Sequence, residues 1–83
     1  MITAKEAKEL SISANSKYKH EELIKIEQMI MNQIESGLFM CVDVFKENVP
    51  HLSYKEVFNH FNPLGYSVTE YDRFYKISWS IIQ

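Results

Sequence analysis

The segment YKHEELIKIEQMIMNQIESG (residues 18–37) carries the clearest pattern of the chain. Its aliphatic residues recur every three or four positions, which is the period of one helix face. Gly37 can adopt the left-handed conformation that often ends a helix, so the pattern predicts a helix from about Tyr18 to Ser36. If successive residues are placed 100° apart, six apolar side chains fall on an arc roughly 160° wide: Leu23, Ile24, Ile26, Ile30, Met31 and Ile34.

This arc is wider than the ~100° stripe that suffices to cover one core. The surplus, which includes Ile24 and Met31, needs a second neighbour, either an N-terminal helix of the same chain or another copy of the protein. Glu27 falls inside the arc, where a carboxylate is costly unless it is paired or lies at an edge. We therefore predict that Ile24, Glu27 and Met31 line an interaction surface.

The chain begins with a second helix signal. In TAKE (residues 3–6), Thr3 and Glu6 have the spacing of a capping box, in which each side chain accepts a backbone N–H of the other's turn. The following SISANS (residues 11–16) is rich in side chains that compete with the helical backbone for hydrogen bonds. We therefore predict a break there and two N-terminal helices, with one continuous, bent helix as the alternative.

After Gly37 the period changes from that of a helix to that of a strand. In LFMCVDVF (residues 38–45), apolar residues alternate with mixed ones, which predicts a strand with one apolar face. Pro50 interrupts it, and SYKE (residues 53–56) repeats the capping-box spacing and opens a short helix. Asn62 and Pro63 end that helix, because the residue before a proline disfavours helical geometry.

The C-terminal segment LGYSVTEYDRFYKISW (residues 64–79) predicts an antiparallel hairpin with a reversal near residues 71–74. Tyr66 and Val68 share one face of the first strand. The second strand carries an apolar set on one face: Tyr75, Ile77, Trp79 and Ile81. The predicted class is α+β, with helices covering a small, mostly antiparallel sheet in a single domain spanning residues 1–83.

Most of the C-terminal rings are needed for the core, because each buried ring removes roughly 150–250 Å² from water. The residues predicted to be buried are Phe58, Phe61, Tyr75, Ile77 and Trp79. Tyr71 and Phe74 instead lie at the reversal, where Arg73 and Lys76 complete an aromatic and cationic cluster of the kind that stacks on bases or anchors a partner. The alternative is a ring that folds back on its own turn.

Composition limits the function classes. Nine Lys and Arg against eleven Asp and Glu leave no basic excess for sequence-independent nucleic-acid binding. A lone cysteine, Cys41, cannot form an internal disulfide, which suits a reducing compartment. The N-terminus is charged where a signal peptide would be apolar, and no run reaches the ~18–20 residues of a membrane span. We expect a soluble, cytoplasmic protein with no membrane partner.

The sequence contains no motif that we can assign to catalysis or to a cofactor. His20, Cys41, His51 and His60 lie on separate predicted elements without the paired spacing of a zinc site. Both glycines stand alone at element ends, so no phosphate-binding loop is present. We therefore predict a protein that is not an enzyme and that has no catalytic, cofactor or metal residues.

Three short motifs follow one another along the chain: Thr3, Ala4, Glu6 and Ala7 of a TA-x-EA helix, then Gly65, Tyr66 and Val68 of a G-Y-x-V strand, then Ile77, Ser78 and Trp79 of an I-S-W strand. In these motifs the chain resembles small uncharacterised proteins of tailed bacteriophages. The likeness spans most of the chain in order. The Met-rich MIMNQIESGLFM (residues 29–40) departs from the pattern, and methionine is common at adaptable contact surfaces. The resemblance implies a phage accessory protein in the cytoplasm of the infected bacterium.

We therefore expect a non-enzymatic interaction module that takes part in host takeover, either by self-association into a homo-oligomer or by binding a host protein. One alternative is nucleic-acid or nucleotide binding through the hairpin tip, with Tyr71 and Phe74 stacking and Arg73 and Lys76 contacting phosphate. A second alternative is a minor structural component of the virion.

Overall fold

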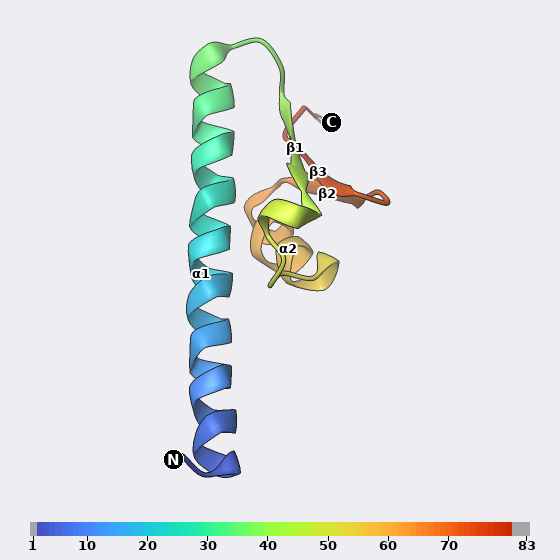
Figure 1. Cartoon of the computed structure of the whole chain (residues 1–83). Helices are drawn as coiled ribbons and strands as arrows, with labels where there is room; N and C mark the ends of the chain where they lie inside the picture. The colour runs from blue at the N-terminus through green and yellow to red at the C-terminus, as the bar shows by residue number, and fades with distance from the viewer. Residues whose placement is uncertain (1, 81–83) are drawn as a thin grey trace.

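The computed structural model of the protein describes residues 2–80. Figure 1 shows a long helix beside a small sheet and a short helix. In chain order the elements are α1 (Ala4–Ser36), β1 (Cys41–Phe45), the 3-10 helix η1 (Lys46–Asn48), α2 (Tyr54–Phe61), the 3-10 helix η2 (Asn62–Leu64), β2 (Ser67–Glu70) and β3 (Phe74–Ser78). The α+β class predicted from the sequence is confirmed.

The prediction of two N-terminal helices was wrong, because α1 runs without interruption through the SISANS segment. Serine and asparagine each cost a helix only a few tenths of a kcal/mol relative to alanine, whereas glycine costs about 1 and proline about 3. Neither glycine nor proline occurs between residues 4 and 36. Continuing a helix adds one hydrogen bond per residue, while restarting it requires a new nucleus. The predicted helix ends hold: Thr3 caps α1, and Gly37 follows it at φ 67°.

The three strands form an antiparallel sheet in the order β1-β3-β2. The hairpin predicted at the C-terminus is the β2–β3 pair, and β1 lies on the other side of β3. Val42 and Val68 both stand opposite Ile77 across the ladders, and Val44 stands opposite Tyr75. These side chains share one face of the sheet, which is the face that the helices cover.

The core lies between this sheet face and the two helices. Its buried members are Ile26, Ile30, Val42, Val44, Val49, Leu52, Val57, Phe61, Val68, Tyr75 and Ile77. Phe61, Tyr75 and Ile77 were predicted correctly, while Phe58 and Trp79 are only partly buried against the core. Ile81 lies outside the described residues. Ser53 and Glu56 form the predicted capping box at the start of α2.

The molecule is elongated, measuring 55 × 23 × 22 Å, because the globular part packs against only the C-terminal half of α1 (Figure 1). We call residues 4–17 the stem: all of them are exposed except Ala7, which is half-buried. The first contacts to the globular part come just after the stem, where Tyr18 stacks on His51 and Lys19 pairs with Glu56 at 2.8 Å. At 1.5 Å per residue, the stem extends about 21 Å beyond these contacts.

One buried carboxylate ties α1 to the segment between β1 and α2. Glu22 is the only charged residue of the described chain that is buried. One of its oxygens accepts the backbone N–H of His51 at 3.0 Å, and the other contacts Nδ1 of the same residue. A buried carboxylate requires such donors. His51 therefore holds the α2 side of the molecule to α1.

Candidate interaction surfaces

Ile24 and Met31 lie on a lateral face of α1, where Met31 borders a shallow hollow lined also by Phe61 and Leu64 of the globular part. Each is 50% exposed, whereas Ile26 and Ile30, which belong to the core, are buried. Because α1 is one straight element, the N-terminal residues cannot fold back to cover this face. The apolar surplus predicted from the sequence therefore remains uncovered in the single chain.

Three exposed residues follow one line along this face. Leu10, Ile24 and Met31 are separated by fourteen and seven positions, or about four and two helical turns. We call these three residues the outer stripe. Lys17 occupies the position between Leu10 and Ile24 that would complete the seven-residue spacing, which is the spacing of helices that pack lengthwise. Leu10 was not among the predicted contact residues, although its place in the repeat is readable from the sequence.

Glu27 lies at the edge of this face and is exposed. The imidazole of His60 on α2 lies beside it, with Nε2 and Oε2 4.0 Å apart, too far for a hydrogen bond. Glu27 also borders a shallow hollow of about 130 Å³ between α1 and the α2–η2 segment. Glu27 thus has no strong partner within the described chain, and its carboxylate is free to pair with another molecule.

The second predicted surface, at the hairpin tip, is an aromatic cluster. Tyr71 and Phe74 stack with ring centroids 4.8 Å apart and planes at 17°. The structure thus brings together these two residues of the predicted cluster. Phe45 of β1 adds a third ring, 5.8 Å from Phe74, because register places these two residues opposite each other. Phe45 was missed, since the strand order β1-β3-β2 cannot be read from the hairpin alone. We call these three residues the tip cluster.

The charges around the tip cluster nearly cancel. Lys46 forms an ion pair with Glu70 at 2.9 Å, and this hydrogen bond raises the pKa of Lys46. Arg73 is exposed beside Asp72, while Lys76 stands in register between Asp43 and Thr69 on the uncovered face of the sheet. The surrounding side chains carry four acids and three bases: Asp43, Glu47, Glu70 and Asp72 against Lys46, Arg73 and Lys76. This balance does not form the basic patch that phosphate backbones require.

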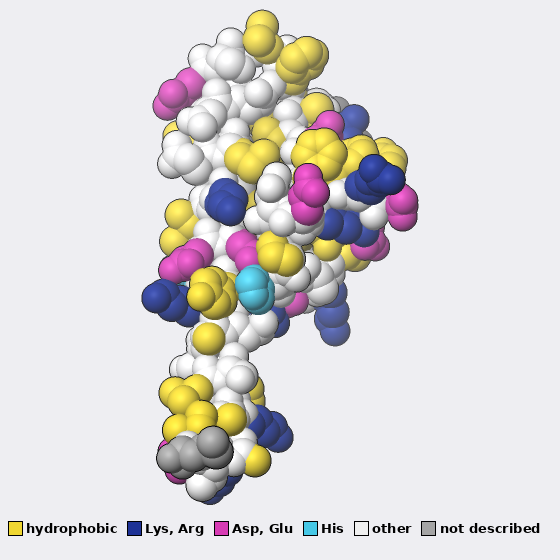
Figure 2. Space-filling view, in the orientation of Figure 1, with side chains coloured by type: hydrophobic (Ala, Val, Ile, Leu, Met, Phe, Trp, Pro, Cys, Tyr) yellow, Lys and Arg dark blue, Asp and Glu magenta, His cyan; other side chains and the backbone are white. Residues whose placement is uncertain are grey.

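Within residues 2–80, no group of three or more His, Cys, Asp or Glu side chains is arranged to hold a metal ion. His20 is exposed on α1, and Cys41 is half-buried on β1. No helix in the described part of the chain is long and apolar enough to cross a membrane. Figure 2 shows apolar side chains on the stem, near the far end of α1, and beside the sheet.

Comparison of the chain with family models, with curated proteins and with solved structures gives no match.

Proposed function

We propose that the protein is a non-enzymatic interaction module that self-associates through the outer stripe of α1. The observation that carries the proposal is that the stem projects into solvent while Ile24 and Met31 stay uncovered on the same side of the same helix. An isolated helix of about 14 residues is marginal in water, so the stem gains stability from a neighbour. A second copy supplies a neighbour whose uncovered surface has matching length.

An antiparallel pairing of two α1 helices covers the stem and the outer stripe of each copy at once. It sets Leu10 of each copy against Met31 of the other, so that each stem covers the outer stripe of its partner's globular half. Lys17 then faces Ile24 of the second copy, where the methylene groups of the lysine side chain add apolar contact. The globular part of each copy borders this contact at Met31, where Leu64 and Tyr66 line the same shallow hollow.

Charge favours this direction over a parallel one. In the antiparallel pair, Lys17 lies between Glu21 and Glu27 of the second copy, three positions on either side of Ile24. In a parallel pair, Lys17 would face Lys17, and like charges on the seam are destabilising. Glu6 and Glu35 oppose each other at the ends of the antiparallel pair, where both are exposed and well screened by salt.

The stripe is narrow, with three apolar side chains per copy, so the association is weak and depends on concentration. The test is molar mass by light scattering across a series that extends to millimolar protein. We expect Leu10→Glu to weaken the dimer by about tenfold or more, equivalent to about 1.4 kcal/mol. Ile12→Glu is the matched control, because Ile12 is 57% exposed against 60% for Leu10 but points away from the stripe. A constant monomer mass throughout the series would refute self-association.

A charge exchange tests the direction of pairing. Glu27→Lys brings two lysines together in the antiparallel dimer and weakens it. Adding Lys17→Glu to the same chain restores the attraction and the dimer. If the double variant is weaker than either single variant, the antiparallel register is wrong.

The resemblance to tailed-phage proteins supports an accessory role in the cytoplasm of an infected bacterium, and the tip cluster is a second candidate surface, for a host protein. Tyrosine and phenylalanine rings such as these three are enriched at the centres of protein interfaces. Nucleic-acid or nucleotide binding at the same place draws support from the exposed Tyr71–Phe74 stack but not from the charge balance. Retention on nucleic acid that falls steeply with salt would favour this alternative, and co-purification with assembled particles would favour a virion component.

A further inference from the structure

The two outer edges of the sheet differ in how their backbone groups are satisfied. In an antiparallel ladder, alternate residues bond to the neighbouring strand and the others point away. The bonds from Trp79 to Met40 and from Lys46 to Arg73 mark the even-numbered residues of β1 as those bonded to β3. The N–H and C=O groups of the odd-numbered residues therefore face outward: Cys41, Asp43 and Phe45.

The opposite edge, at β2, is partly closed by the protein itself. There the outward carbonyl of Val68 accepts the Tyr54 hydroxyl at 3.3 Å, and the carbonyl of Tyr66 just before the strand accepts Nδ2 of Asn62 at 3.3 Å. No corresponding side chain in the described chain reaches the outward groups of β1. The β1 edge is therefore the free one, and unpaired edges are templates for pairing with another strand.

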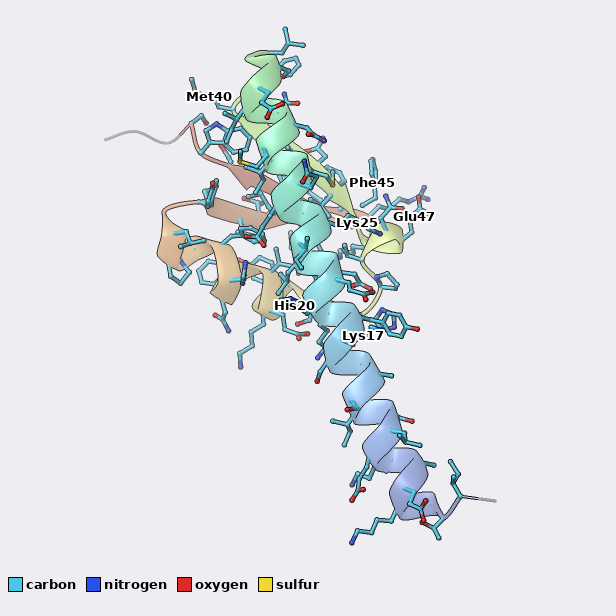
Figure 3. All side chains as sticks on the ribbon, turned by 90° about the vertical axis from the view of Figure 1, so that its left-hand side faces the viewer. Lys17, His20, Lys25, Met40, Phe45 and Glu47 are labelled. Atoms are coloured by element: carbon cyan, nitrogen blue, oxygen red, sulfur yellow. The ribbon has the colours of Figure 1, made fainter. Side chains whose placement is uncertain are left out.

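A groove accompanies this free edge. It has a volume of about 580 Å³ and lies between the C-terminal half of α1 and β1. Met29, Phe39 and Val42 supply apolar walls, while Asn32 and Gln33 of α1 supply side-chain amides. Figure 3 shows β1 passing behind this part of α1, between the labelled Met40, which precedes the strand, and Phe45, which is its last residue. Apolar walls beside a row of backbone donors and acceptors fit an extended peptide.

We propose that the β1 edge binds an extended peptide segment of a partner protein by strand addition. Backbone groups of Cys41, Asp43 and Phe45 pair with alternate residues of the peptide, as in other cases where a peptide adds a strand to a sheet. The intervening peptide side chains are apolar and enter the groove toward Met29 and Phe39. The remaining side chains stand beside Asp43, whose charge favours basic or neutral residues there and disfavours acidic ones.

A second copy of the chain fits this edge less well than a single peptide does. Joining two β1 edges around a two-fold axis through Asp43 would set that carboxylate against its own copy. It would also bring together the flanks of two α1 helices, and the flank on this side carries the charged Lys25 and the polar Asn32. This strand addition is independent of self-association through the outer stripe, which uses another face of α1.

The test begins with a displayed library of random peptides of about seven residues, a length typical of strands, selected against the purified protein. We expect enriched peptides that alternate apolar with basic or neutral residues. On binding, amide hydrogen exchange at Cys41, Asp43 and Phe45 slows by about tenfold, the effect of one backbone hydrogen bond of typical net strength. Exchange at Val68 and Glu70 on the other edge stays unchanged. An empty selection, or protection confined to α1 or β2, overturns the proposal.

Backbone methylation of an enriched peptide separates strand addition from side-chain binding. Methylating the amides of one alternate set removes the donors that face β1 and abolishes binding, while methylating the other set has little effect. In the protein, Asp43→Pro removes an outward N–H that β3 does not use, and Asp43→Asn keeps this N–H and removes only the charge. We expect at least tenfold loss for the first and less than threefold for the second. Equal tolerance of both methylated peptides overturns the proposal, whether or not the proline variant folds.

Discussion

Replacing Glu22 by alanine removes the one buried carboxylate that joins α1 to the segment before α2. The variant leaves the backbone N–H of His51 without its acceptor and breaks the contact with the imidazole. Both donors belong to a half-buried residue, so water replaces part of what is lost. The predicted result is a clear loss of stability with little change in helix content.

The magnitude follows from the two contacts. A hydrogen bond to a charged group contributes about 1.5–3 kcal/mol. Allowing for partial replacement by water, Glu22→Ala costs about 2–3 kcal/mol in the free energy of unfolding. For a domain of this length each kcal/mol shifts the melting temperature by about 4–8 °C, so the midpoint falls by at least about 8 °C.

Thermal unfolding by circular dichroism at a fixed, low concentration measures this shift without interference from the proposed self-association. Glu21→Ala is the matched control, because Glu21 is its exposed neighbour and should change stability by about 0.5 kcal/mol or less. Glu22→Gln keeps an acceptor for the N–H of His51 and should fall between the two. If Glu22→Ala and Glu21→Ala melt together, the buried carboxylate is not a stabilising tie.

Three further predictions concern capping and ionisation. Burial raises the pKa of the Tyr75 hydroxyl, so its stabilising effect is fully present below the ordinary tyrosine pKa of about 10 and is lost as pH rises toward the folded value. Urea midpoints at neutral and alkaline pH should show a smaller alkaline loss for Tyr75→Phe than for the wild type. The hydrogen bond from Lys19 lowers the pKa of Glu56, so stability is present above the ordinary glutamate pKa of about 4.3 and is lost as pH falls through the folded value. Acid unfolding of Glu56→Gln should therefore be less steep, and an unchanged slope would count against the ion pair. Gly37→Ala places a side chain at φ 67° and should cost about 1–2 kcal/mol in denaturant unfolding, whereas a neutral result would mean that the helix end relaxes.

Local signals in the sequence predicted most elements of the fold. The two capping spacings at Thr3 and Ser53 located both helix starts, and Gly37 located the end of α1. Alternation of apolar residues located β1 and the hairpin. These signals work because caps, left-handed positions and period-two patterns are decided by near neighbours in the chain.

The errors concern features that depend on distant parts of the chain or on a balance of small free energies. The break expected at residues 11–16 did not occur, because several weak helix formers together do not outweigh the cost of a second nucleation. The position of β1 beside β3 placed Phe45 against Phe74, and pairing across 29 positions leaves no local mark. For the same reason, the tie between Glu22 and His51 was not foreseen.

The free stem also governs how the protein moves through solution. Its radius of gyration is 15.4 Å, whereas a compact chain follows roughly 2.2·N^0.38 Å and would reach that value only at about 170 residues. A lone chain therefore elutes from a gel-filtration column earlier than a compact chain of the same mass. Elution volume by itself would overstate the mass of the single molecule.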